Sequence, residues 1–332
     1  MQIFPAVTVI IPNYNHSQYL EERIESVLHQ SFQDFELILI DDCSSDNSKA
    51  ILEVYRNHPK ISKILYNEKN SGSVFKQWIK AIELSKGKYT WIAESDDVAH
   101  LDFLKETVNL AEQQKEFGLV FTASKVIDQN GELQNRFLQP SYLQDGFSLH
   151  SKKDIADYLI ADMIIRNASS VLFSTQHLRS IDKSELVKFK NTGDRYVYSK
   201  IGLQAPIYYI DKALNYYRSH GENTTAKNRE NKTIYRDHLY NILYLVANFQ
   251  ESKYCQEVLL HFFYARVFVV LHYKFYKVYR LLLVKFYKAG YISLRFYLEM
   301  LVMKVMYQSL GKIPTSYRSY FKARSGYHDL FL

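Results

Sequence analysis

The chain reads FELILIDD from residue 35 to residue 42, an apolar run that stops at two carboxylates. Two further runs have the same form: VTVII at residues 7–11 stops at Pro12, and YTWIA at residues 89–93 stops at Glu94. Between the runs at 7–11 and 35–42, apolar residues recur at the spacing of an amphipathic helix. Strands that alternate with helices predict an α/β fold, with a mainly parallel sheet covered by helices on both faces.

The alternation continues to about residue 123 and then becomes mixed. We expect helices at residues 45–55, 73–84 and 101–114, and strands at residues 61–66 and 119–123. Farther along, Asn130 and Gly131 predict a hairpin turn, and short strands are expected at residues 169–173 and 207–210. From about residue 228 onward turn-forming residues become rare, which predicts an α-helical C-terminal region.

The composition is that of a folded chain whose charge is unevenly distributed. Of the 332 residues, 47% are hydrophobic and 15% aromatic, which excludes disorder and collagen-like repetition. The formal net charge is +7, yet residues 254–332 alone carry twelve Lys or Arg against three Asp or Glu. We therefore expect one domain at residues 1–225 and a separate basic, aromatic-rich region at residues 226–332.

The cysteines and the apolar runs predict a cytoplasmic location. Cys43 and Cys255 are too few for a disulfide framework, and they do not form a metal-spaced pair. The first six residues lack the basic start and the apolar stretch of a signal peptide. No uncharged apolar run approaches the roughly 18 residues that a spanning helix needs. We expect the cytoplasm, with the inner face of the cell membrane as the alternative if the basic region binds lipid.

Polar residues follow three of the predicted strands at the point where each strand ends. They are PNYN at residues 12–15, DD at residues 41–42 and ESDD at residues 94–97. In open parallel sheets the ligand crevice lies beyond the carboxyl ends of the strands, so these residues are expected together. The three carboxylates at residues 94–97 repel one another unless they share a cation, which favours a Mg²⁺ or Mn²⁺ site. The alternative is a helix N-cap at Asp97.

These three motifs, in this order, resemble those of family-2 glycosyltransferases. The resemblance covers residues 5–225 and continues at residues 192–194, which read TGD, and at residues 216–220, which read YYRSH. It implies a GT-A fold and the transfer of a sugar from a nucleotide diphosphate donor, with inversion at the anomeric carbon. A UDP-sugar is favoured, because the family most often binds uracil at the position of Asp42. The implied acceptor is a hydroxyl of a surface polysaccharide, a lipid-linked glycan or a glycoprotein glycan.

The resemblance also implies roles for individual residues. The nucleotide would contact Pro12, Asn13, Tyr14, Asn15, Asp42, Asn70, Lys76 and Ser95. A Mn²⁺ or Mg²⁺ cofactor would be held by Asp96, Glu94 and His220, although Glu94 stands where the family more often has Asp. The donor sugar or the acceptor would contact Asn167, Ser169, Asp97 and Arg218, with Arg218 as a contact to phosphate.

Asp194 matches the position of the family's catalytic base. A base is needed because an acceptor hydroxyl is a weak nucleophile until a carboxylate takes its proton. An Asp at this place can also cap the helix that follows it. The two roles are compatible, since the start of a helix holds a side chain rigidly.

Two other functions stay open on the sequence. A nucleotidyltransferase also places acids and a nucleotide at parallel strand ends, but PNYN at residues 12–15 is not the Gly- and Lys-rich phosphate loop expected there. The second alternative is a catalytically impaired relative that only binds a nucleotide sugar or acts as a scaffold. The presence of Asp42, Asp96 and Asp194 argues against it.

The basic region has the pattern of an amphipathic helix. Its Lys and Arg residues between positions 266 and 288 share one arc of a helical wheel, and apolar residues fall on the other side. We expect these helices to join copies of the chain into a homo-oligomer, and peripheral membrane association is the second interpretation. Nothing resembles a nucleic-acid reader motif, so no nucleic-acid partner is expected.

Overall fold

The computed structural model describes residues 4–155, 158–159 and 163–220, residues 237 and 241, and a few residues between 284 and 305. Contacts divide the chain into two units: residues 1–155 with 163–237, and residues 156–162 with 238–332. The first unit holds every strand that the structure describes, and the predicted boundary at residue 225 falls outside the described residues. The basic amphipathic pattern at residues 266–288 lies almost wholly outside the described residues, so the predicted oligomer and membrane contacts stay predictions.

Four parallel strands form the first half of the sheet, as the alternating pattern predicts. They are β1 (Val7–Asn13), β2 (Phe35–Asp41), β3 (Ile61–Tyr66) and β4 (Tyr89–Ile92), in the order β3-β2-β1-β4. The register pairs Asn13 with Asp41, so β1 and β2 end together. Every residue of β1 is buried, which is typical of a central strand covered on both faces. The α/β fold class is confirmed.

The second half of the sheet is mixed. Strand β9 (Val171–Ser174) runs antiparallel to both β4 and β6 (Leu119–Ile127), and β10 (Ile207–Arg218) runs parallel to β6. Strands β5 (Val98–Ala99) and β8 (Ser148–Leu149) pair antiparallel to β10. The predicted turn is confirmed, because Gly131 has a φ of 87° between β6 and the antiparallel strand β7 (Leu133–Phe137).

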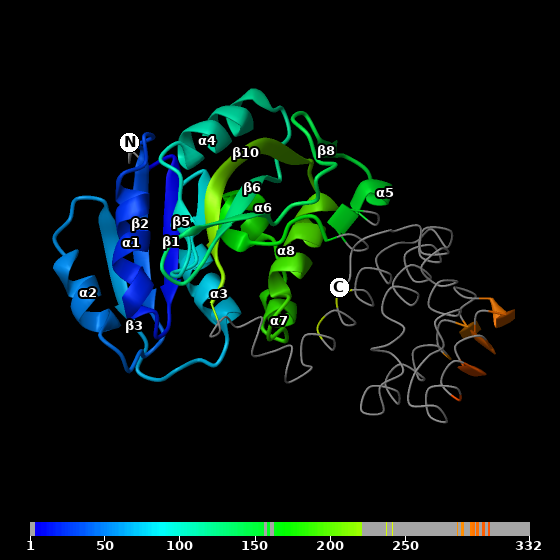
Figure 1. Cartoon of the computed structure of the whole chain (residues 1–332), viewed down its shortest axis with the longest axis horizontal. Coiled ribbons are helices and arrows are strands. Elements are labelled where there is room, and N and C mark those ends of the chain that lie inside the picture. Colours follow the sequence, from blue (N-terminus) through cyan, green and yellow to red (C-terminus); the bar gives the residue numbers. More distant parts are fainter. Residues whose placement is uncertain are drawn as a thin grey trace. The chain divides into compact units, whose positions relative to one another are not determined.

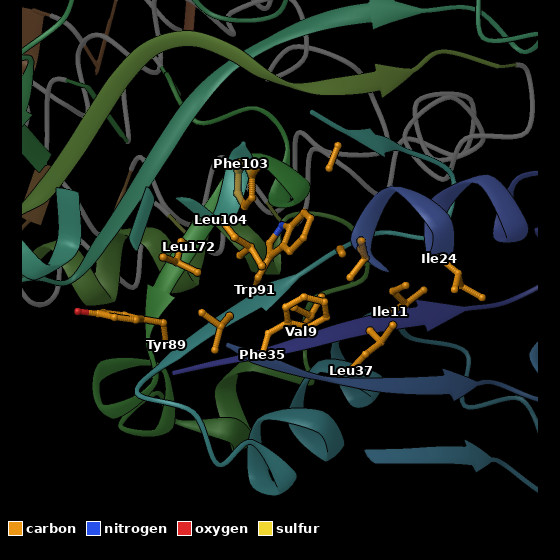
Figure 2. Packing of buried hydrophobic residues seen from close by; sticks show 14 of the residues in the cluster. Val9, Ile11, Ile24, Phe35, Leu37, Tyr89, Trp91, Phe103, Leu104 and Leu172 are labelled. Atoms are coloured by element: carbon orange, nitrogen blue, oxygen red, sulfur yellow. The ribbon is translucent and has the colours of Figure 1, made fainter. Parts of the chain in front are cut away.

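Three helices cover one face of the parallel strands: α1 (Ser17–Leu28), α2 (Ser48–Val54) and α4 (Phe103–Gln113). Their apolar residues pack with alternate residues of the strands, such as Val9 and Ile11 of β1. Figure 2 shows this core around Trp91, whose ring lies 4.4 Å from that of Phe103 between centroids. Figure 1 shows α1 and α2 beside the blue strands β1 to β3.

The other helices are α3 (Val74–Leu84), α5 (Lys152–Asp154), α6 (Thr175–Arg179), α7 (Lys183–Leu186) and α8 (Gly193–Gly202). Helix α3 packs on β1, β2 and α6, and α8 packs on α6, α7 and β6. The buried side of α3 carries Phe75 and Trp78, which are three residues apart and therefore lie on one face of the helix. Among the described residues, no helix combines the length and the apolar character needed to cross a membrane.

Candidate functional site at the carboxyl ends of the parallel strands

The polar residues that follow β1, β2 and β4 lie at one edge of the sheet. The backbone N–H of Asp42 donates to the carbonyl of Asn13 over 2.9 Å, and that of Ala93 donates to the carbonyl of Ile10 over 2.8 Å. Because parallel strands end at the same edge, these bonds bring PNYN, DD and ESDD together as predicted.

Hydrogen bonds to residues at the end of β2 and just after it fix the segment at the end of β1, and one of its side chains is exposed. Asn13 donates through Nδ2 to Asp41 Oδ1 over 2.8 Å, and Asn15 Oδ1 accepts the N–H of Ser45 over 2.8 Å. Asn15 has a φ of 54°, a left-handed conformation that Asn tolerates better than most residues. Pro12 and Asn13 are buried, whereas Tyr14 is 47% exposed. Tyr14 is therefore the member of this loop that offers a ring to a ligand.

Asp42 fastens the loop that follows β3. Its carboxylate accepts from Asn67 Nδ2 over 2.7 Å and from the hydroxyl of Ser71 over 2.8 Å. The side chain of Asn70 donates to the carbonyl of Asp42 over 3.2 Å, and the exposed Lys76 donates to the carbonyl of Ser71 over 3.0 Å. Asp42, Asn70 and Lys76, all assigned to the nucleotide from sequence, are thus neighbours in the structure. Asn67 and Ser71 were not predicted, and polar residues after a strand end are the signal that marks them.

Three side chains from separate segments converge as a candidate metal site: His16, Asp96 and His220. Their ligand atoms lie within 4.8 Å of one another, and His220 Nε2 is 3.1 Å from Asp96 Oδ2. Ser95 Oγ lies 2.8 Å from His16 Nδ1, which orients the ring and leaves Nε2 as its ligand atom. Burial opposes the ionisation of Asp96, but His220 and His16 outweigh it, so the pKa of Asp96 lies below its ordinary value. Two imidazoles and a carboxylate fit a divalent transition metal such as Mn²⁺.

His16 was not predicted from the sequence, although it directly follows PNYN in the same strand-end loop. The structure does not bring Glu94 into the group of His16, Asp96 and His220. Instead Glu94 Oε1 accepts the indole N–H of Trp78 over 3.1 Å, and its backbone N–H donates to Ser169 Oγ over 3.1 Å. Burial, with the charges of Asp96 and Asp97, raises the pKa of Glu94 to about 8.

Two buried arginines balance the acidic residues. Arg23 of α1 lies over the ring of Trp91, with Cζ 5.0 Å from its centroid, and none of its guanidinium nitrogens has a hydrogen-bond partner among the described residues. Burial lowers the pKa of Arg23 to about 10, against the attraction of Asp97, Asp96 and Glu94. Arg23 thus supplies a positive charge behind the acidic cluster without being tied to one carboxylate.

Arg218, assigned to phosphate from sequence, is turned into the protein. Its Nε donates to the carbonyl of Asp96 over 2.8 Å, its backbone N–H donates to Asp97 Oδ1 over 2.9 Å, and its guanidinium also pairs with Glu22. The side chain is 2% exposed. Arg218 therefore supports the loop that carries Asp96 and Asp97.

The residues assigned to the donor sugar or the acceptor also form hydrogen bonds within the protein. Asn167 donates through Nδ2 to Asp97 Oδ2 over 2.8 Å, and Ser169 accepts the indole N–H of Trp91 at its carbonyl over 2.8 Å. Asn167, Ser169 and Asp97 are all buried. Burial, together with the charge of Asp96, raises the pKa of Asp97 to about 6. Asn167 and Ser169 therefore support the acidic segment from inside the protein through hydrogen bonds to Asp97 and Glu94.

Asp194 lies in the first turn of α8, where helix geometry favours a carboxylate. The preceding Gly193 packs so closely on Phe75 that a Cβ built there would lie 2.8 Å from the ring. Burial raises the pKa of Asp194, and the charge of Asp237 acts in the same direction. Asp194 is thus a half-buried carboxylate with a raised pKa at the start of a helix.

Helix α3 links Asp194 to the acidic residues. Phe75 contacts Gly193, Trp78 donates to Glu94, and the two rings meet edge to face with centroids 5.5 Å apart. The charges of Asp194 and Glu94 both raise the pKa of Tyr198, after burial, so this tyrosine lies within reach of both. The site therefore joins a carboxylate cluster on strand ends to a carboxylate on α8 through one buried helix face.

Comparison with known proteins agrees with this arrangement. The family model described as Glycosyl transferase family 2 matches residues 8–170. TuaG of Bacillus subtilis, named for teichuronic acid biosynthesis, is 33% identical over 134 residues, which are 40% of this chain and 52% of TuaG. Chondroitin synthase of Escherichia coli is 26% identical over 67% of this chain and 30% of its own length. The chain thus spans about half or less of the length of these two relatives.

Solved structures share the fold. The crystal structure of TarS residues 1–349 from Staphylococcus aureus in complex with UDP superposes with a TM-score of 0.59 at 21% identity, covering 78% of this chain and 71% of that one. A mannosyltransferase of Pyrobaculum calidifontis, solved with GDP-Man and Mn²⁺, has a TM-score of 0.51 at 13% identity over 97% of this chain and 85% of that one. The chain therefore carries a domain that belongs to glycosyl transferase family 2 and has the GT-A fold.

Proposed function

We propose that this chain transfers a sugar from a UDP-sugar to a glycan hydroxyl, with inversion, and that Asp194 is the general base. The observation that carries the proposal is the half-buried carboxylate of Asp194 on the start of α8, whose pKa burial raises and which α3 links to the acidic strand ends. A carboxylate with a raised pKa takes a proton more readily than an ordinary one. Direct displacement by the activated hydroxyl needs one base and no covalent intermediate, which gives inversion.

The residues His16, Asp96 and His220 would hold a divalent cation in this reaction. When bound, the cation would stabilise the negative charge of the diphosphate leaving group. Imidazole ligands favour transition metals over Mg²⁺, so we expect Mn²⁺ to bind more tightly than Mg²⁺. The structure of the P. calidifontis mannosyltransferase with Mn²⁺ supports this choice.

The donor and the acceptor are proposed from the relatives. TarS has been solved with UDP and with UDP-GlcNAc, which supports a uridine nucleotide near Tyr14 and Asp42. TuaG and chondroitin synthase are named for teichuronic acid and chondroitin, which supports a polysaccharide as the acceptor. The cytoplasmic location, the domain limit at residue 225 and the roles of residues 226–332 in self-association or membrane binding stay predictions.

Calorimetric titration with UDP, GDP and UDP-GlcNAc, each with and without Mn²⁺, tests the proposal. We expect Mn²⁺-dependent binding of UDP and its sugar, and loss of that dependence in Asp96→Ala. Asp182→Asn is the matched control, because Asp182 caps α7 on the surface away from the strand ends. Binding of GDP alone would contradict the uridine donor, and failure of the folded protein to bind any of the three would favour the scaffold alternative.

A further inference from the structure

Asp237 is a buried carboxylate that lies outside the sequence motifs described above. It belongs to the first unit, lies beyond the stretch matched by the family model, and is 2% exposed. Its Oδ2 accepts the backbone N–H groups of Lys190 and Asn191, each over 2.6 Å, and that of Thr192 over 3.4 Å. Consecutive N–H groups that converge on one oxygen form an anion-binding nest, and here the anion is a side chain of the same protein.

The three residues that Asp237 binds lead directly into the candidate base. Thr192 is the N-cap residue of α8, and Asp194 is the second residue of that helix. On the other side of this turn, Gly193 presses against the ring of Phe75. The turn is therefore clamped between a carboxylate and an aromatic ring, and Asp194 is the next side chain along the chain.

We propose that Asp237 is a positioning residue for Asp194: its carboxylate holds the turn at residues 190–192 and so fixes the start of α8. The proposal rests on the proposed function, in which Asp194 is the general base. Loss of the acceptor removes a hydrogen bond from each of three consecutive backbone N–H groups. The turn would relax to satisfy them, and Asp194 would move with it.

The charge of Asp237 also acts on Asp194. Among the described residues, the charged and titratable groups around Asp194 include Arg195, Asp237 and Tyr198, and Glu94 acts on the same tyrosine. Arg195 lowers the pKa of Asp194, whereas burial and Asp237 raise it. Removal of the Asp237 charge should therefore lower the pKa of Asp194 and move the acidic limb of the activity profile to lower pH.

The experiment compares Asp237→Asn, Asp237→Ala and Asp237→Glu in the full chain. Asp237→Asn removes the charge and keeps an acceptor oxygen, and Asp237→Ala removes both. Asp237→Glu keeps a carboxylate on a longer side chain. Asp182→Asn is the matched control, since Asp182 accepts the backbone N–H groups of Ser184 and Glu185 at the start of α7. Asp194→Asn is included as a separate test of the base.

Two readouts are measured. Amide hydrogen exchange of residues 190–192 needs no substrate, and we expect faster exchange in Asp237→Ala than in Asp237→Glu or in the control. The second readout is the pH profile of UDP release from UDP-GlcNAc with Mn²⁺. We expect kcat of Asp237→Ala to fall by about ten- to a hundredfold, with KM nearly unchanged, because a small displacement of a reacting group has this effect. We expect the acidic limb of Asp237→Asn to shift to lower pH.

The outcomes separate the two proposals. Unchanged exchange at residues 190–192 and an unchanged pH profile in all three variants, while Asp194→Asn is inactive, would overturn the role of Asp237 and leave the base in place. A fully active Asp194→Asn would overturn the proposed base, and with it the positioning role, whatever the exchange result. If Asp237→Ala does not fold, the comparison of Asp237→Asn with Asp237→Glu decides by the same two readouts.

Discussion

Trp78 donates its indole N–H to Glu94 Oε1 over 3.1 Å, so a helix on one face of the sheet holds an acid at the end of β4. Three residues before Trp78 on the same helix, Phe75 packs on Gly193 at the start of α8. Glu94 of the acidic cluster and the start of α8 therefore both contact one surface of α3. This connection makes substitutions in α3 informative about the site.

Trp78→Phe should weaken both stability and donor binding. An aromatic ring is kept, although it is smaller than the indole, and Glu94 loses a hydrogen bond in a buried place, which should lower the free energy of unfolding by about 1–3 kcal/mol. Urea denaturation gives the stability, and calorimetry with UDP and Mn²⁺ gives the affinity. The companion Phe75→Leu removes no hydrogen bond from Glu94, so an equal loss of affinity in both would contradict a specific role of the indole N–H.

Gly193→Ala should impair the proposed base, Asp194, without disturbing the candidate metal site. A Cβ at this position would lie 2.8 Å from the ring of Phe75, so α8 or the ring must shift. Overpacking of this kind costs about 1–3 kcal/mol, and transfer should fall while Mn²⁺ affinity is unchanged. Gly202→Ala, which crowds Ile155 and Ile207 at the other end of α8, is the control for general destabilisation. Rescue of the transfer rate by adding Phe75→Leu would support the clash as the cause.

Asp194→Asn should lower transfer by about a hundredfold or more and leave the binding of UDP intact. It should also raise thermal stability at neutral pH. Burial raises the pKa of Asp194 in the folded state, so the ionised carboxylate disfavours folding once the pH exceeds the ordinary carboxyl range. Below that range the carboxyl is protonated in both states and the gain should vanish. Melting temperatures measured across pH check this, and equal values for the two proteins at neutral pH would contradict the burial of the charge.

His16→Ala should weaken Mn²⁺ binding by at least about tenfold, since even partners that only orient a metal ligand contribute ten- to a hundredfold. Titration of free Mn²⁺ by electron paramagnetic resonance measures the affinity without any turnover. His29→Ala is the control, because His29 is an exposed histidine at the end of the same helix α1. Unchanged Mn²⁺ affinity in His16→Ala would remove His16 from the metal site.

Arg23→Met should leave the protein at least as stable at neutral pH, because burial outweighs the attraction of Asp97, Asp96 and Glu94 and lowers the pKa of Arg23, so the charged guanidinium disfavours folding. Arg23→Lys keeps the charge but loses the planar contact with Trp91, so it should be less stable than Arg23→Met. Urea denaturation of the three proteins gives the comparison. A Met variant clearly less stable than the parent protein would show that the acidic cluster needs a counter-charge from α1.

Much of the fold and part of the site were readable from local patterns. The strands at residues 7–11, 35–40 and 89–93 were predicted because an apolar run between polar ends is a property of neighbouring residues, and the structure confirms them. Their parallel order then places the residues after them at one edge. The predicted strand at residues 207–210 continues to Arg218, across two register shifts against β6 that no local pattern encodes.

The partners within the site follow from packing. His16 lies beside Asp96 and His220, and Arg218 donates to the carbonyl of Asp96. Asp237 accepts backbone N–H groups from the turn before α8. Each of these contacts joins residues far apart in sequence, so periodicity and motif spacing carry no signal for them. The sequence by itself determined the alternating elements, the acidic strand ends and the family resemblance, because these depend on local pattern and order. Only the tertiary structure decided which of these side chains are exposed and which form contacts within the protein, because sheet register and helix packing set their directions.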